Sequence, residues 1–207
     1  MAREGGAEVI LVDNGSTDDT PAILERLLRD QRQCRSVRVE SNRGYGLGIL
    51  TGLGHARSTV LGWTHADLQT DPADALAAAV LFDAPGPPPF VKGRRYGRPI
   101  SDVAFTVGMS IFETLLLRRR LWDINAQPTM FRREFFESWR NPPHDFSLDL
   151  YAFYQARRQG LPVRRVPVRF VARAHGQSRW NVNWAAKRRF IRRTVAFSLQ
   201  LRRSKAS

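Results

Sequence analysis

The sequence Val60-Leu-Gly-Trp-Thr-His-Ala-Asp-Leu-Gln-Thr-Asp-Pro72 joins a short apolar run, a polar tip and the start of a helix. The apolar run, residues 60–63, predicts a strand. Asp71 and Pro72 predict where the helix begins, because Asp is a favoured N-cap and Pro is favoured in the first helical turn. Open α/β sheets bind ligands at the carboxyl ends of their strands, so this tip is a candidate site.

Three polar side chains of the tip alternate along the chain, at His65, Asp67 and Gln69. In an extended segment such side chains point the same way. Together, an imidazole, a carboxylate and an amide oxygen could hold one divalent cation. The alternative for this pattern taken alone is an ordinary polar loop in which Asp71 caps the helix.

The first half of the chain repeats the order of strand, turn and helix. Residues 8–12 form an almost unbroken aliphatic run, as in a parallel strand covered on both faces. A turn-rich segment then leads to a helix over about residues 21–33. Residues 36–40 predict a second strand, and residues 42–48 predict a glycine-rich loop before a helix of small residues. The buried stripe of the first helix is expected to contain Ile23, Leu24, Leu27 and Leu28.

Further helices are predicted over about residues 74–82, 103–119 and 146–159, and strands over residues 90–92 and 163–170. The second of these helices carries the apolar residues Val107, Ile111 and Leu115. Alternation of strands and helices predicts an α/β fold with a mostly parallel, Rossmann-like sheet flanked by helices. We expect one domain over residues 1–180, followed by a basic amphipathic C-terminal helix and tail over residues 181–207.

The net charge of +14 implies an anionic partner, such as nucleic acid, an acidic membrane surface or a phosphorylated ligand. Arginine is dense in residues 118–120, 164–165 and 187–203. The last segment mixes these cations with aromatic and aliphatic residues, which indicates a helix lying in a membrane interface or, alternatively, a docked helix with a solvated basic face. No apolar run is long enough to cross a bilayer and no signal peptide is evident, so we expect a cytoplasmic protein, with peripheral contact to the inner face of the membrane left open.

Five segments occur in the order of the motifs of one enzyme family. They are Val12-Asp-Asn-Gly-Ser-Thr-Asp-Asp-Thr20, Asn42-Arg-Gly-Tyr-Gly-Leu-Gly48, His65-Ala-Asp-Leu-Gln-Thr-Asp-Pro72, Gly93-Arg-Arg95, and Val166-Pro-Val168 followed by Arg173-Ala-His-Gly-Gln-Ser-Arg179. This series resembles the family 2 glycosyltransferases, nucleotide-sugar enzymes of the GT-A fold. The branch it resembles most is the polyprenyl-phosphate, dolichol-phosphate mannose synthase-like transferases.

The resemblance implies a nucleotide-diphosphate sugar donor and a metal ion, Mn²⁺ or Mg²⁺. The cation would neutralise the diphosphate as the anomeric bond breaks. Its implied ligands are His65, Asp67 and Gln69, and the imidazole favours manganese. The implied donor-binding residues are Asp13, Asn14, Ser16, Gly46, Arg95, Arg173 and Arg179. The alternative for Asp13 is a residue that only forms a turn. The alternative for the three arginines is a solvated surface side chain.

The implied reaction is a metal-assisted, inverting sugar transfer to a lipid-phosphate or saccharide acceptor. Asp67, Asp149 and Arg95 are the predicted catalytic residues, and Gln127 and Asp145 are predicted to contact the acceptor. A phosphate acceptor needs no general base. A hydroxyl acceptor needs one, for which the two later aspartates are candidates, with helix capping as the alternative for the first of them.

Two departures from the family pattern bear on activity. His65 stands where the family has the first of two paired carboxylates. The family also begins with an additional strand and helix, so we expect a truncated chain. A non-catalytic relative that binds nucleotide sugar or a membrane surface is therefore the alternative function. A nucleic-acid partner is not expected, since no helix-turn-helix, zinc or RNA-recognition motif accompanies the basic charge.

Overall fold

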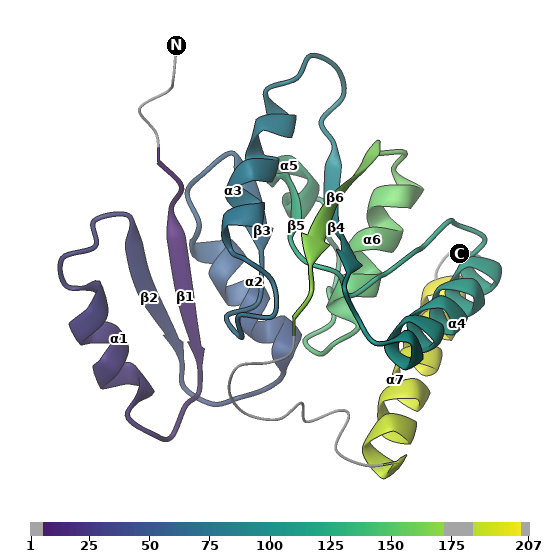
Figure 1. Ribbon diagram of the computed structural model, residues 1–207, viewed down its shortest axis with the longest axis horizontal. Coiled ribbons are helices and arrows are strands. Elements are labelled where there is room, and N and C mark those ends of the chain that lie inside the picture. The colour runs from purple at the N-terminus through teal and green to yellow at the C-terminus, as the bar shows by residue number, and fades with distance from the viewer. Residues whose placement is uncertain (1–5, 172–183, 204–207) are drawn as a thin grey trace.

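The computed structural model describes residues 6–171 and 184–203 as alternating strands and helices (Figure 1). The elements in chain order are β1 (Val9–Asn14), α1 (Thr20–Leu28), β2 (Cys34–Val39), α2 (Tyr45–His55), β3 (Val60–Trp63), α3 (Ala73–Ala79), the 3-10 helix Val80–Phe82, β4 (Phe90–Tyr96), α4 (Ile100–Leu117), β5 (Thr129–Arg132), α5 (Arg133–Glu137), α6 (Leu148–Arg158), β6 (Val163–Arg169) and α7 (Trp184–Arg203). The α/β prediction is confirmed.

The larger sheet is mixed rather than mostly parallel. Its strand order is β3-β5-β4-β6, and β5 runs antiparallel to both of its neighbours. β4 and β6 are parallel, as are β1 and β2 in a separate two-stranded sheet. The prediction was wrong because β5 has only four residues and follows a long irregular connection, so neither its existence nor its direction is evident from alternation of elements.

The β1–β2 sheet is less buried than its aliphatic sequence predicts. Val9 is 40% exposed, and residues 10–12 are only half-buried. α1 contacts β2 at the edge of the molecule and contains no buried residue, with Leu27 61% exposed (Figure 1). The predicted buried stripe of α1 is therefore wrong. The physical reason is that, among the described residues, α1 covers a sheet of two strands with little apolar surface to pack against.

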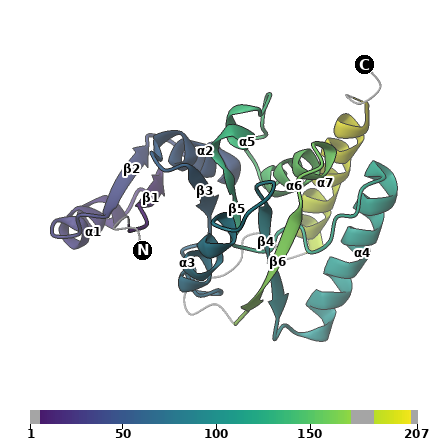
Figure 2. The same cartoon turned by 90° about the horizontal axis from the view of Figure 1, so that it is seen from above.

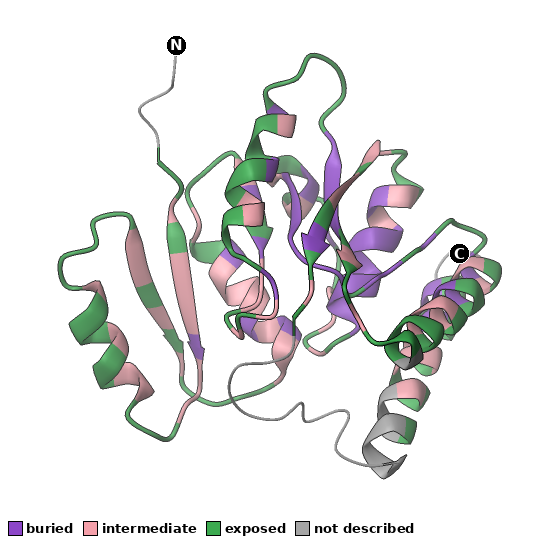
Figure 3. Ribbon diagram, viewed as in Figure 1, coloured by how far each residue is buried: buried purple, intermediate pink, exposed green. Residues whose placement is uncertain are grey.

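The main hydrophobic core lies between the larger sheet and helices α5 and α6 (Figure 3). Its centre is a group of aromatic rings in which Phe90 of β4 stacks on Phe131 of β5 and on Phe153 of α6, with centroid distances of 6.0 and 5.7 Å. Phe131 also meets Phe135 and Trp139 edge-on or tilted. Offset and edge-to-face contacts of this kind add stabilisation beyond simple apolar burial. This core fixes the strands that carry the polar residues described below.

A helix is present in the C-terminal segment, and it packs beside α4 (Figure 2). Leu201 of α7 joins the main core, and Ser198 donates a hydrogen bond of 2.8 Å to the buried carboxylate of Glu113 in α4. Arg192, Arg193 and the two terminal arginines of the helix are exposed. This packing matches the docked-helix alternative. In the described parts of the chain, no helix has the length and apolar composition to cross a membrane.

The absence of a side chain at Gly93 is required by packing in β4. A Cβ atom at this position would overlap the carbonyl oxygen of Gln127, and the Gly93 amide already donates to the Pro128 carbonyl at 2.9 Å. We predict that Gly93→Ala lowers the free energy of unfolding by about 3 kcal/mol, because backbone must move to admit the methyl group. Urea denaturation measures this change. The control is Gly54→Ala in α2, where a Cβ meets open space; it should raise stability by up to about 1 kcal/mol. Equal effects of the two substitutions would contradict the packing argument.

Burial of Glu113 makes the α4–α7 contact dependent on pH. Desolvation raises its pKa from 4.5 to about 7, and the hydrogen bond from Ser198 only partly opposes this. Between pH 4.5 and 7 the folded chain keeps a proton that the unfolded chain has released, so this contribution to stability falls as pH rises. We predict that Glu113→Gln is more stable than the wild type at pH 8, by about 2 to 3 kcal/mol, and less pH-dependent in this window.

The measurement for Glu113 is urea denaturation at pH 4.5, 6 and 8. The exposed Glu25 of α1 supplies the matched control, Glu25→Gln. If Glu113→Gln and Glu25→Gln follow the same pH profile as the wild type, the buried carboxylate does not govern this contact.

Candidate functional site

The tip of β3 does not gather the three predicted metal ligands in the expected way. Asp67 Oδ1 accepts the backbone N–H of Gln69 at 3.2 Å, and Leu68 between them has a φ of 56°. The side-chain Nε2 of Gln69 donates to the backbone carbonyl of Val171 at 3.3 Å, and the backbone N–H of Val171 donates to the backbone carbonyl of Gln69 at 2.9 Å. The left-handed turn breaks the simple alternation on which the prediction rested. Gln69 is therefore held against the chain after β6.

His65, the first predicted ligand, is fixed by Tyr45 from the start of α2. Its Nε2 lies 2.8 Å from the Tyr45 hydroxyl, which donates its single proton to Asp149 Oδ2 at 3.0 Å. Desolvation lowers the pKa of His65 and so favours the neutral ring. With the hydroxyl proton committed to Asp149, the Nε2–H must be the donor to Tyr45. Nδ1 then carries the lone pair that a metal ion requires.

Asp149, a predicted catalytic residue, is 2% exposed and belongs to a buried polar network. Its Oδ1 accepts Lys92 Nζ at 3.1 Å and Gln127 Nε2 at 3.0 Å, while Oδ2 accepts the Tyr45 hydroxyl. Lys92 also donates to Thr129 at 2.7 Å, and burial lowers its pKa to about 8 against the opposing effect of Asp149. Both oxygens of Asp149 are thus occupied by internal donors. This geometry does not suit the predicted role of a general base.

Gln127, a predicted acceptor contact, is also part of this interior. Its amide nitrogen donates to Asp149, and its carbonyl oxygen accepts the Thr129 hydroxyl at 3.1 Å. The Gln127-Pro128 peptide is cis and the side chain is 2% exposed. The residue therefore orients Asp149 in this structure, and the prediction that it touches an acceptor has no support from its position.

Three of the residues predicted to bind the donor, Asp13, Asn14 and Ser16, lie where β1 ends. Asp13 is buried, and its Oδ1 accepts the Ser16 N–H at 2.9 Å. Hydrogen bonds from Ser16 lower the pKa of Asp13, with a further contribution from Arg38, whose Nε lies 3.7 Å from Oδ2. Among the described residues, no donor makes a hydrogen bond to Asp13 Oδ2 or to the equally buried Oδ1 of Asn14. Two unsatisfied acceptors at one strand end are suited to the N–H groups of a base or the hydroxyls of a ribose.

Residues 42–48, predicted as a loop, are a short loop up to Gly44 followed by the first turn of α2, and they join this strand end to the tip of β3. Asn14 Nδ2 donates to the Gly44 carbonyl at 3.0 Å, and the next residue, Tyr45, bonds to His65. The ends of β1 and β3 therefore lie at one edge of the protein even though their sheets are separate. Gly46, a predicted donor contact, faces residues 143–145, where a Cβ would crowd the Pro143 carbonyl. Packing against the chain itself explains this glycine.

Asp145, the second predicted acceptor contact, accepts the Ser147 N–H at 2.9 Å, and its carbonyl accepts the Leu148 N–H at the start of α6. This matches the capping alternative. The residue is half-buried and also lines an open hollow of about 380 Å³ beside Arg43 and Arg193. Access to this hollow distinguishes Asp145 from the fully enclosed Asp149.

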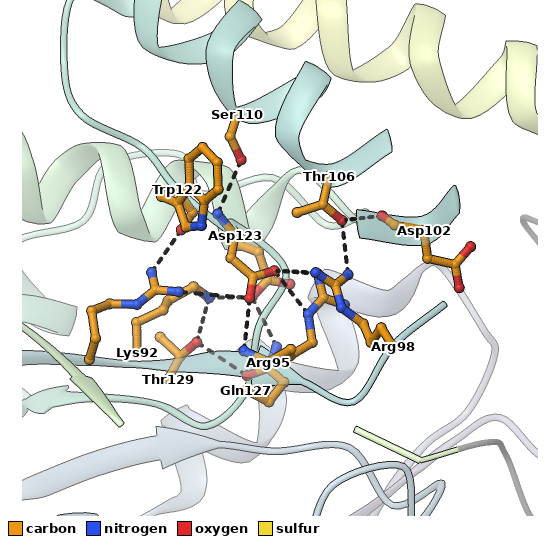
Figure 4. Close-up of polar contacts among 12 residues, drawn as sticks. Lys92, Arg95, Arg98, Asp102, Thr106, Ser110, Trp122, Asp123, Gln127 and Thr129 are labelled. Atoms are coloured by element: carbon orange, nitrogen blue, oxygen red, sulfur yellow. Dashed lines mark hydrogen bonds and ion pairs between the residues drawn. The ribbon is translucent and has the colours of Figure 1, made fainter. Parts of the chain in front are cut away.

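A second buried cluster surrounds Asp123, which sequence reasoning missed (Figure 4). The backbone N–H and the guanidinium of Arg95 both donate to its carboxylate, the Nε at 2.9 Å, and Arg98 and Arg165 lie within 4 Å of it. Burial opposes ionisation of Asp123, but the interactions with Arg95 outweigh it and lower its pKa. The predicted phosphate clamp, Arg95, is thus engaged with an internal carboxylate. Arg173 and Arg179, the other predicted clamps, lie outside the described residues.

Tyr45, Lys92 and Asp123 are the polar residues of this region that the sequence did not reveal as important. Lys92 had the one usable signal, because a lysine inside a short apolar strand must reach either solvent or a buried partner. Nothing in the spacing of Asp123 indicates three arginine neighbours from two strands and a loop. The role of each of these three residues depends on hydrogen bonds or ion pairs with residues that are distant in the sequence.

The residues at the β3 tip fit a metal ion in part. Asp67 offers a carboxylate and His65 offers Nδ1, both suitable ligands for manganese or magnesium together with phosphate oxygens of a substrate. Within residues 6–171 and 184–203, no three His, Cys, Asp or Glu side chains converge as a metal site. Of the described residues, His65 and Asp67 could therefore supply two ligands, and a substrate's diphosphate could supply others.

Comparison with known proteins identifies the family. The family described as glycosyl transferase family 2 matches residues 3–148, about 70% of the 207 residues. The chain belongs to this family. Glycosyltransferase AglD of Haloferax volcanii is 27% identical over 168 residues, which cover 78% of this chain and 27% of that protein. The family member described here thus spans about a quarter of the length of that relative.

Solved structures of two other proteins share the fold. Glucosyl-3-phosphoglycerate synthase from Mycobacterium tuberculosis, in complex with Mn²⁺, UDP-glucose and glycerol 3-phosphate, is 20% identical, with a TM-score of 0.67 over 93% of this chain and 68% of that one. The mannosyltransferase PcManGT from Pyrobaculum calidifontis, in complex with GDP-mannose and Mn²⁺, is 22% identical, with a TM-score of 0.60 over 82% and 49%. These likenesses confirm the GT-A-like fold. The dolichol-phosphate mannose synthase branch stays a prediction.

The buried Lys92–Asp149 pair supplies a test of the network. Lys92→Met leaves the Asp149 carboxylate buried without its counter-charge, so we predict a loss of about 3 to 5 kcal/mol in the free energy of unfolding. The double variant Lys92→Met/Asp149→Leu should lose less, since no charge is then stranded. Arg35→Met, which breaks the half-buried and more solvent-accessible pair with Glu8, should cost about 1 kcal/mol or less. Urea denaturation of the three variants gives these free energies of unfolding. A double variant that is less stable than Lys92→Met would refute the conclusion that the stranded charge of Asp149 causes the loss.

Proposed function

We propose that this family 2 member transfers a sugar from a nucleotide-diphosphate donor to a lipid-phosphate or saccharide acceptor, with inversion at the anomeric carbon. One observation carries the proposal. Gly44 and Tyr45, at the start of α2, hydrogen-bond to Asn14 and His65 respectively, which supports one continuous polar edge from the end of β1 to the tip of β3. A single donor molecule could then place its nucleoside at the end of β1 and its diphosphate at the tip of β3.

In this proposal Asp13, Asn14 and Ser16 hold the nucleoside. The unsatisfied carboxylate and amide oxygens at the end of β1 would accept hydrogen bonds from the base and ribose. Arg173 and Arg179 are retained as predicted contacts to the diphosphate. Arg95 is assigned a positioning role instead, because its guanidinium holds Asp123 and thereby the connection that precedes β5.

A divalent cation is proposed at Asp67 and His65. Such an ion would supply a Lewis acid for the diphosphate leaving group. Tyr45 fixes the His65 tautomer that leaves Nδ1 as a ligand, and Asp149 in turn orients the Tyr45 hydroxyl. The side-chain Nε2 of Gln69 donates to the Val171 carbonyl, so only the side-chain Oε1 of Gln69 is available as a metal ligand. Asp67 is the one carboxylate of the tip and the ligand on which metal binding depends most.

The enclosed position of Asp149 favours a phosphate acceptor in this proposal. A lipid phosphate is anionic at neutral pH and attacks without a general base, whereas a sugar hydroxyl must lose a proton. Asp145, beside the open hollow, is the remaining carboxylate for a hydroxyl acceptor. The displacement forms the bond from the acceptor oxygen to the anomeric carbon as the bond to the nucleotide diphosphate breaks.

The alternative is a relative that binds nucleotide sugar without turnover. It is favoured by one specific observation, the histidine at position 65 in place of a carboxylate, which leaves the tip a single acidic ligand. Binding and turnover must therefore be measured separately. Release of nucleotide diphosphate from UDP-glucose or GDP-mannose, with and without a polyprenyl phosphate, measures turnover.

Calorimetric titration of the chain with UDP and with GDP, each with and without Mn²⁺, tests the donor site. We predict metal-dependent binding of one nucleotide, weakened about tenfold or more in Asp67→Ala, because the carboxylate carries the charge that binds the cation. The control is Asp71→Ala, which removes a cap from Ala73 at the start of α3 but no proposed ligand. It should bind as the wild type does. A folded wild-type chain that binds neither nucleotide would overturn the proposal, and binding without turnover would establish the alternative.

A further inference from the structure

Helix α4 turns four of its polar residues toward the protein, whereas Asp102 in its first turn is exposed. Ser110 accepts the Asp123 N–H at 3.1 Å, and the Thr114 hydroxyl bonds to both backbone groups of Leu121 at 3.0 and 3.2 Å. Thr106 accepts from Arg98 at 2.9 Å, and Glu113 accepts from Ser198 of α7. The inner face of α4 therefore satisfies the Asp123 cluster and the connection to β5 (Figure 4). An ordinary surface helix has the opposite arrangement, with its apolar face inward.

The outer face of α4 is apolar along its whole length. Ile100 is 87% exposed, Ile111 50% and Leu115 73%, and Val103 and Phe112 are exposed between them. With about 100° of rotation per residue, Ile100, Ile111 and Leu115 lie within about 60° of one another around the helix axis and form a single stripe, with Phe112 beside it. Val103, seven positions before Ser110, lies nearer the polar side. Val107, on the same side, is half-buried. Figure 2 shows α4 at the outer edge of the molecule with α7 on its inner side. With residues 6–171 and 184–203 in place, the stripe stays open to solvent.

Cations lie at the end of this stripe and on the helix behind it. Arg118, Arg119 and Arg120 are exposed directly after α4. The neighbouring helix α7 has seven Lys and Arg residues and no Asp or Glu in its sequence. Of these, Arg188, Arg192, Arg193, Arg202 and Arg203 are exposed. An apolar helix face beside dense arginine matches the two zones of an anionic lipid surface, whose acyl region takes aliphatic side chains and whose headgroups take cations.

We propose that α4 lies in the plane of an anionic membrane surface, with its stripe (Ile100, Ile111 and Leu115, beside Phe112) in the acyl boundary and Arg118, Arg119 and Arg120 at the headgroups. The arginines of α7 add to the attraction toward the anionic surface. No described helix is suited to crossing the membrane, consistent with in-plane binding. A second copy is a poorer occupant, because two chains of net charge +14 would bring arginine-rich surfaces together. The lipid-borne acceptor in this inference rests on the proposed function. Membrane binding itself can be measured without any sugar transfer.

Co-sedimentation of the full chain with vesicles tests this surface. We expect binding to phosphatidylcholine vesicles that contain phosphatidylglycerol, and much weaker binding to phosphatidylcholine alone. Ile111→Ser/Leu115→Ser should weaken the binding about tenfold or more, since two large aliphatic side chains no longer enter the lipid. The matched control is Leu27→Ser on α1, equally exposed at the opposite end of the molecule (Figure 1). It should bind as the wild type does.

A probe at the stripe separates insertion from adsorption by charge alone. In a Cys34→Ser background, an environment-sensitive fluorophore on Leu115→Cys should shift to shorter wavelength with anionic vesicles, and the same label on Leu27→Cys should not. Failure of the wild type to bind anionic vesicles, or unchanged binding of the double variant, would overturn the proposal. So would self-association in sedimentation velocity that Ile111→Ser/Leu115→Ser abolishes, because the stripe would then serve a second copy. Nucleotide titration of the same double variant should be unchanged, so failure of the membrane surface and of the donor site can be told apart.

Discussion

The buried carboxylate of Asp149 is the interaction on which the architecture of the site depends. It accepts hydrogen bonds from α2, from β4 and from the connection before β5, through Tyr45, Lys92 and Gln127. An ion pair in the interior is stable only when every donor and acceptor is used, and removing one partner strands the other. The network therefore holds three elements in register and, through Tyr45, sets the hydrogen-bonding state of His65 at the edge where the donor is proposed to bind.

A comparable constraint acts around Asp123 and has a consequence for the surface. Its carboxylate and backbone are satisfied by Arg95 and by Ser110, which requires the polar side of α4 to face inward. A helix with one polar and one apolar side must then present the apolar side outward. The exposed stripe of α4 is thus the counterpart of a buried polar cluster, and both the interior of the protein and its proposed membrane surface follow from the orientation of one helix.

Much of the chain was predictable from local pattern. The strands and helices of the first half, the helix start after Asp71 and the C-terminal helix follow from apolar periodicity and from capping and turn residues, which act over a few positions. The family was predictable from five short motifs in order. The antiparallel β5 was not, because a four-residue strand has no direction until its neighbours are placed. The outward apolar side of α4 was not either, because periodicity shows that a helix has two faces and says nothing of which one points inward.

The sequence by itself determined the family, the α/β class and the polar ends of β1 and β3, since these depend on motifs and on neighbouring residues. Only the tertiary structure decided what the individual side chains do. It placed Asp149 and Gln127 in the interior, Arg95 on Asp123, Gln69 on Val171, and Gly46 against residues 143–145. The physical reason is that the role of a charged or polar group depends on its partners and on its exposure to water. The hydrogen bonds just named, from Gln127 to Asp149, from Arg95 to Asp123 and from Gln69 to Val171, join residues 22, 28 and 102 positions apart in sequence, a separation over which local pattern carries no information.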